Sequence, residues 1–169
     1  YKTLIDLAIL LKNRIDVYTQ TSEKYILDEL NKCDLINLHP AIPYEKLISI
    51  EKRAKLIIQV KTLEKNYIKD TANGFSTKIA DSLGLGIPLL VVCNKESFLY
   101  KYLEEYDCFL LCSTLNEAKR MFDNYLCNMA FIDKKIKNSL KTFRLNHNAE
   151  KNSEKFYFPT SSKMPIRYH

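Results

Sequence analysis

Short apolar runs alternate along the chain with longer stretches in which apolar residues recur every three or four positions. The short runs are typical of buried strands, and the longer stretches are typical of helices with one apolar face. Strands are predicted at 15–19, 35–39, 55–60, 89–93 and 108–112. Helices are predicted at 1–12, 21–33, 43–54, 76–84, 95–106, 113–126, 129–145 and 148–157. This alternation indicates an α/β fold with a Rossmann-like parallel sheet flanked by helices and joined by right-handed crossovers.

Residues 73–88, with the sequence NGFSTKIADSLGLGIP, predict a loop, a short helix and a glycine stop before the strand at 89–93. A hydroxyl of Ser76 or Thr77 can cap this helix, because it accepts a hydrogen bond from an otherwise unpaired N–H group. Gly84 and Gly86 are expected to end the helix, since glycine takes a positive φ without steric cost. A plain connecting helix and a ligand-binding helix both fit this pattern.

The position of this helix in the predicted sheet favours a ligand. The polar loop at 61–73 follows the strand at 55–60 and is too long for an ordinary connection, and loops of that length are usually functional or mobile. Ligands of open α/β sheets bind beyond the carboxyl ends of the strands. A helix that begins there presents free N–H groups and a partial positive charge, which suit phosphate or sugar hydroxyls.

The spacing of residues in the same stretch resembles the donor-binding signature of GT-B glycosyltransferases of family 4 (group 1). That signature runs Glu-Gly-Phe-Gly, a short spacer, Glu-Ala, and then a glycine and Pro-Val. The positions that match outright are Gly74, Phe75, Gly86 and Pro88. Asp81 stands where the family's second Glu binds the nucleotide ribose, and Asn73 stands where its first Glu contacts the donor sugar. Ser76 replaces the second glycine.

This resemblance implies the donor-binding half of a GT-B fold, acting on a UDP- or GDP-sugar. The sugar would pass to a glycan, lipid-linked or protein acceptor, as in polysaccharide biosynthesis. Basic groups and helix N–H donors, not a metal or other cofactor, would offset the charge of the leaving diphosphate. The implied donor-binding residues are Asn73, Gly74, Phe75, Ser76, Thr77, Lys78 and Asp81, with no catalytic residue assigned.

The resemblance covers roughly residues 1–126, and it leaves parts of the family's fold unaccounted for. The family's first strand, which precedes the helix at 1–12, is missing from this sequence, and so is the acceptor-binding N-terminal domain. The sequence begins with Tyr1, not Met, and no signal-peptide pattern follows. We therefore expect a piece of a longer protein that is inactive by itself.

Charge divides the chain into a donor-binding domain at 1–127 and a basic region of helices and tail at 128–169. The basic region holds three acidic residues and nine basic ones, and its net charge of +6 equals that of the whole chain. Such a region can contact an anionic membrane at its inner face, or it can be an ordinary solvated helix face. Its basic residues are Lys134, Lys135, Lys137, Lys141, Arg144, Lys151, Lys155, Lys163 and Arg167. No nucleic-acid-binding motif is present.

The remaining candidate chemistry is sparse. The five cysteines have no metal-binding spacing and are expected to be mostly buried free thiols in a reducing cytoplasm. His39, at a strand end, is either a nucleobase contact or a structural histidine. Because Asn73 lacks the charge of the family's Glu, a second hypothesis remains: a non-catalytic Rossmann-like partner or interaction module.

Overall fold

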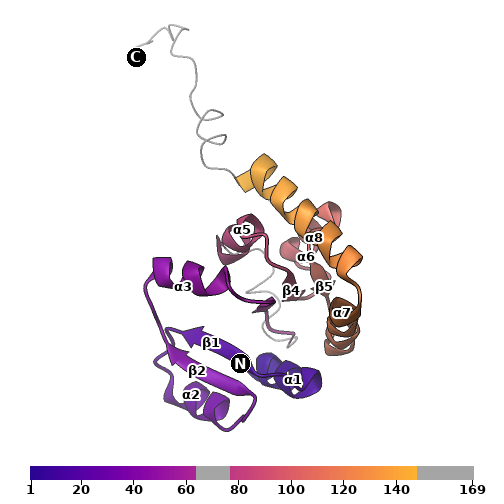
Figure 1. Ribbon diagram of the computed structural model, residues 1–169. Helices are drawn as coiled ribbons and strands as arrows, with labels where there is room; N and C mark the ends of the chain where they lie inside the picture. The colour runs from indigo at the N-terminus through magenta and orange to yellow at the C-terminus, as the bar shows by residue number, and fades with distance from the viewer. Residues whose placement is uncertain (64–76, 148–169) are drawn as a thin grey trace, which may run out of the picture.

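This computed structural model describes residues 1–63 and 77–147, and in these ranges the protein is an α/β structure with parallel strands (Figure 1). The strands form two sheets. One pairs two strands and the other has the order β3-β4-β5. The strands are β1 (Ile15–Thr19), β2 (Ile36–Pro40), β3 (Ile57–Val60), β4 (Leu89–Val92) and β5 (Leu110–Cys112).

Helices connect the strands and cover the sheets. They are α1 (Lys2–Leu11), α2 (Lys24–Asn31), α3 (Tyr44–Glu51), α5 (Thr77–Gly84), α6 (Phe98–Tyr106), α7 (Leu115–Cys127) and α8 (Met129–Thr142). A π-helical turn, η2 (Phe143–His147), continues α8, where the sequence pattern predicted ordinary helix to residue 145. The parallel α/β class predicted from the sequence is thus confirmed.

The core is divided into three clusters. Strand β4 is buried along its whole length. Leu89 and Val91 pack with α5 and α6 on one face, while Leu90 and Val92 pack with α1 and α7 on the other. The third cluster is smaller and lies between α1, α2 and the β1–β2 sheet. Helix α1 therefore contributes to the cores of both sheets, with Ala8 in the third cluster and neighbouring residues in the second.

The single sheet expected from the sequence is replaced by two sheets in the described residues. Strand β1 pairs only with β2, and β3 pairs only with β4. The physical reason is that no described strand lies between β1 and β3 to join them by backbone hydrogen bonds. Figure 1 shows the β1–β2 unit set apart from β4 and β5, with α1 beside it.

Several helix boundaries follow local hydrogen bonds. Helix α2 begins later than the predicted start at residue 21, since Glu23 is the N-cap and makes no side-chain cap. The Thr21 hydroxyl instead accepts the Glu23 N–H before the helix begins. Helix α6 begins later than predicted because the Ser97 hydroxyl accepts the N–H of Tyr100. Helix α7 begins close to its predicted start at residue 113, where the Thr114 hydroxyl accepts the N–H of Glu117.

The two glycines after α5 have different roles. Gly86 has a φ of 68°, so the predicted positive φ is correct there. Gly84 is still helical, and the expectation of a positive φ is wrong for it. Its missing side chain is required by packing, because a Cβ at Gly84 would lie 3.0 Å from Cζ of Phe143.

Candidate functional site

Helix α5 carries the part of the predicted donor site that the structure describes. It begins at Thr77, after β3, and its end leads into β4, as the sequence predicted. The residues Asn73, Gly74, Phe75 and Ser76 lie outside the described part of the chain, and so does the side chain of Thr77. Lys78 and Asp81 can therefore be placed, while the proposed contacts of the loop stay predictions.

Packing fixes which side of α5 faces outward. Ile79 and Leu83 are fully buried in the core against β4 and α6. Lys78 is exposed and Asp81 is half-buried, one turn apart on the helix. Because the apolar face of the helix is anchored, the positions of Lys78 and Asp81 are fixed relative to the sheet.

Helix α3 supplies two side chains beside Asp81. Burial and the nearby charge of Asp81 raise the pKa of the Tyr44 hydroxyl, so this side chain lies close to Asp81. At the other end of α3, burial and the charge of Asp81 raise the pKa of Glu51, while Lys78 lowers it slightly. Tyr44 and Glu51 are seven positions apart and so share one face of α3. The α3–α5 group is defined here as Tyr44, Glu51, Lys78 and Asp81.

This α3–α5 group combines two carboxylates, a phenol and an ammonium group. A carboxylate can accept hydrogen bonds from sugar hydroxyls, and a lysine can pair with a phosphate as a point charge. Two neighbouring carboxylates oppose each other's ionisation, and their negative charge weakens the binding of an anion. The sequence analysis did not single out Tyr44 or Glu51. Their shared helix face was readable in the sequence, but their approach to Asp81 was not.

His39 has a separate set of partners on the β1–β2 sheet. Its Nε2 lies 3.0 Å from Oδ1 of Asp16, and its ring stacks on Tyr18 with centroids 4.6 Å apart. The Asn37 amide also donates to Asp16 Oδ1, at 3.1 Å. These bonds to His39 and Asn37 hold the pKa of Asp16 below its usual value. The partners account for His39 as a cross-strand structural contact between β1 and β2.

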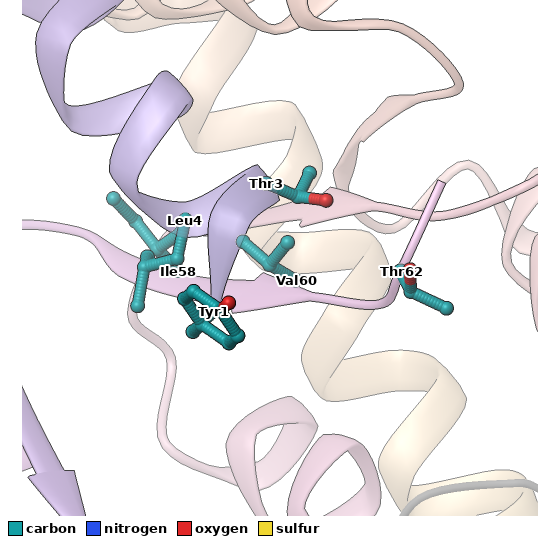
Figure 2. A pocket seen from close by; sticks show the side chains of 6 residues that line it. All are labelled: Tyr1, Thr3, Leu4, Ile58, Val60 and Thr62. Atoms are coloured by element: carbon teal, nitrogen blue, oxygen red, sulfur yellow. The ribbon is translucent and has the colours of Figure 1, made fainter. Parts of the chain in front are cut away.

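Two hollows lie at the beginning of α1, next to the carboxyl end of β3. A pocket of about 190 Å³ is lined by Tyr1, Thr3, Leu4, Ile58, Val60 and Thr62 (Figure 2). A more open one, of about 400 Å³, is lined by Lys2, Thr3, Asp6, Leu63 and Leu115. Neither pocket includes Lys78 or Asp81.

The cysteines are free thiols, and three of them are buried as expected: Cys93, Cys108 and Cys112. Burial raises the pKa of Cys93 to about 11 and that of Cys112 to about 12, so both are protonated at neutral pH. Cys127 is exposed, contrary to the general expectation of burial. In the described ranges, no group of three or more His, Cys, Asp or Glu side chains is placed to hold a metal ion.

Part of the basic C-terminal region is tied to the domain. Lys134 and Lys135 of α8 both pair with Asp107, at the end of α6, and these lysines hold the pKa of Asp107 below its usual value. The Ser139 hydroxyl donates to the carbonyl of Cys108. Residues 148–169 lie outside the described residues. Within the described part of the chain, no helix is both long enough and apolar enough to cross a membrane.

No protein-family model matches this chain, and no curated protein matches it. The chain's function therefore has to be argued from its own residues.

Proposed function

We propose that this protein is the nucleotide-sugar-binding half of a GT-B-type glycosyltransferase. The observation that carries the proposal is the placement of Asp81. It is a half-buried carboxylate on the helix that follows the carboxyl end of β3, in register with the family's ribose-binding acid. Carboxyl ends of parallel strands are where α/β folds bind nucleotides. In this proposal the family's first strand is absent from the described elements.

The proposed roles follow from the chemistry of each group. Asp81 accepts hydrogen bonds from the ribose hydroxyls, and Lys78, exposed one turn earlier, pairs with the diphosphate. The N-terminus of α5, at Thr77, offers its N–H groups to donor oxygens. A diphosphate leaving group stabilised in this way needs no proton from the protein. The proposed reaction transfers the sugar of a UDP- or GDP-sugar to a hydroxyl group of a glycan, lipid-linked or protein acceptor.

A second candidate is a non-catalytic interaction module on the same fold. Two features favour it: Asn73 replaces the family's acidic residue, and Glu51 adds a second carboxylate beside Asp81. A paired acid raises the electrostatic cost of bringing a diphosphate close.

Calorimetric titration with UDP, GDP and their common sugar conjugates separates the two candidates. The test uses the 169-residue chain and also the full-length protein from which this sequence is expected to come. The matched variants are Asp81→Ala and Asp123→Ala. Asp123 is an acid on α7 whose carboxylate pairs with Lys119 and lies outside the α3–α5 group.

The proposed function predicts binding that Asp81→Ala weakens by about 1–3 kcal/mol, the usual cost of losing a hydrogen bond to a charged group. Asp123→Ala leaves the affinity unchanged. Equal effects of the two variants, or no nucleotide binding by the folded protein, would refute the donor site and leave the interaction module.

A further inference from the structure

The packing of helix α8 fixes which of its sides faces solvent. On the inward side, Ile132, Ser139 and Thr142 are buried, and the Ser139 hydroxyl donates to the carbonyl of Cys108 at 2.8 Å. This side packs against α5, α6 and α7, and Figure 1 shows α8 beside α5 and α6. Because the inward side is anchored, the side chains on the opposite side are presented to solvent in a fixed arrangement.

The outward side of α8 carries a row of basic residues. Lys134, Lys137 and Lys141 are exposed and follow one another at intervals of three and four positions, so they share one face of the helix. Arg144 is exposed about one turn further on, in η2. Asp133 is the one acidic residue of α8 and η2. The α8 basic row is defined here as Lys134, Lys137, Lys141 and Arg144.

Most of the charge of the α8 basic row is not neutralised by the described residues. Within the described ranges, Lys134 is the one member of the row with an ion pair, to Asp107 at 3.1 Å. On α7, by contrast, the exposed Asp123 carboxylate pairs with Lys119 one turn away. An ordinary solvated helix face mixes the two signs as α7 does. Unneutralised charge of one sign attracts a partner of the opposite sign.

Exposed aliphatic side chains lie at both ends of the α8 basic row. Leu126 and Met129, where α7 passes into α8, are 61% and 69% exposed, the highest fractions among the large apolar side chains in the described part of the chain. Leu145, directly after Arg144, is 51% exposed. The same surface therefore offers positive charge to anionic groups and aliphatic side chains to a hydrocarbon environment.

This combination favours an anionic lipid bilayer over a nucleic acid. Both partners are attracted by lysine and arginine. Nucleobases, however, stack on free aromatic rings, and the two phenylalanines of α8 and η2, Phe131 and Phe143, are partly buried. Aliphatic side chains such as Leu126 and Met129 gain nothing from phosphate, but they are stabilised at the boundary between lipid headgroups and acyl chains.

We propose that the α8 basic row, with Leu126, Met129 and Leu145 at its ends, is a docking surface for an anionic phospholipid bilayer. The basic side chains contact the lipid headgroups, and the aliphatic side chains enter the boundary with the acyl chains. The surface lies on the side of α8 opposite to its contact with α5. The proposal is therefore independent of nucleotide binding.

Co-sedimentation of the 169-residue chain with lipid vesicles tests the charged part of this surface. One set of vesicles is phosphatidylcholine alone, and the other is equal parts of phosphatidylcholine and phosphatidylserine. The row variant is Lys137→Gln/Lys141→Gln/Arg144→Gln. Its matched control removes the same charge from exposed positions on or next to α2 and α3: Lys24→Gln/Lys46→Gln/Lys52→Gln. Residues 148–169 are unchanged in all variants, so any contact that they make stays constant.

A second pair of variants tests the aliphatic ends without a change of charge. The apolar variant is Leu126→Gln/Met129→Gln. Its matched control is Ile9→Gln/Tyr25→Gln, at two apolar side chains of α1 and α2 that are 56% and 58% exposed. Circular dichroism first establishes that each variant is folded.

We expect the wild type to bind the phosphatidylserine vesicles and not the neutral ones. Each basic residue beside an anionic surface contributes about fivefold, so the row variant should bind at least about tenfold more weakly, while its control stays within about twofold of the wild type. The apolar variant should bind at least about threefold more weakly, again with its control within about twofold.

Three results would overturn the proposal. The first is the absence of binding to phosphatidylserine vesicles by the folded wild type. The second is an equal loss in the row variant and its charge control, which would assign the binding to net charge alone. The third is wild-type binding by the apolar variant together with row-dependent binding of an RNA duplex, which would give the surface to nucleic acid.

Discussion

The contact between Gly84 and Phe143 links the candidate helix α5 to the C-terminal helices. A Cβ at Gly84 would lie 3.0 Å from Cζ and 3.1 Å from Cε1 and Cε2 of Phe143. Those distances are shorter than ordinary carbon–carbon contacts. The Phe143 ring is partly buried and packs against the cluster that holds α5, so a shift of the ring would disturb that packing.

The expected cost of Gly84→Ala combines two opposing terms. Overpacking of this kind costs about 1–3 kcal/mol. Replacing a helical glycine with alanine regains up to about 1 kcal/mol. The single variant should therefore lose roughly 0–3 kcal/mol of unfolding free energy. The double variant Gly84→Ala/Phe143→Leu escapes the clash, so the two changes should be coupled by about 1–3 kcal/mol.

Urea unfolding followed by circular dichroism measures this coupling across the wild type, both single variants and the double variant. Gly86→Ala is the matched control. A Cβ there would lie 3.7 Å from the Leu140 methyl groups, an ordinary contact, but its φ of 68° is costly for alanine. It should lose roughly 1–2 kcal/mol whether or not Phe143 is changed. Additivity of Gly84→Ala with Phe143→Leu within about 0.5 kcal/mol would refute the packing argument.

Two further predictions concern titration. In an NMR titration, Asp81→Asn should lower the raised pKa of Glu51 only partly, because burial is the larger cause of the shift. The control Asp123→Asn should leave the pKa of Glu51 unchanged. A full return of this pKa to its ordinary value in Asp81→Asn would contradict burial as the larger cause. Burial lowers the pKa of His147, whose Nε2 lies 2.7 Å from the Tyr102 hydroxyl. Below the ordinary histidine pKa of about 6.5, the unfolded chain binds a proton at this position more readily than the folded protein does. The stabilisation from neutral His147 should therefore be present above about pH 6.5, and the unfolding free energy should decline as the pH falls through that value. His147→Gln should make this decline less steep. A pH profile of unfolding free energy identical to that of the wild type would refute the role of His147.

Strand positions were largely predictable from the sequence because strand residues form short apolar or alternating runs between polar segments. The run at 89–93 predicted β4 almost to its ends, and the run at 15–19 coincides with β1. Helix starts were less predictable, because a cap depends on which hydroxyl meets which N–H group. Both Ser97 and Thr21 are followed by helix-forming residues, yet only Ser97 caps a helix.

Only the part of the candidate site that lies on a single helix, α5, was predictable from the sequence. The register of Asp81 on α5 followed from glycine and proline spacing within a few residues. Its neighbours Tyr44 and Glu51 belong to another helix, and their approach depends on how α3 and α5 lie across the fold. The same limit explains Gly84. Its contact, Phe143, is far away in sequence, so no local pattern distinguished a packing glycine from a helix-ending one.

Helix α1 contributes to two core clusters, and this has a consequence for the synthesis of the protein. Leu7 and Leu11 share a cluster with Ala118 and Phe122 of α7, so α1 packs on a helix that is synthesised much later. At about 5–20 residues per second, roughly 6–23 seconds separate the synthesis of Leu11 from the completion of α7. During that interval the side of α1 that packs on α7 lacks this partner on the growing chain, although α1 can already pack on α2 and the β1–β2 sheet. Apolar surface exposed in this way during synthesis is prone to non-native contacts, so the α1–α7 contact is completed only late in the making of the chain.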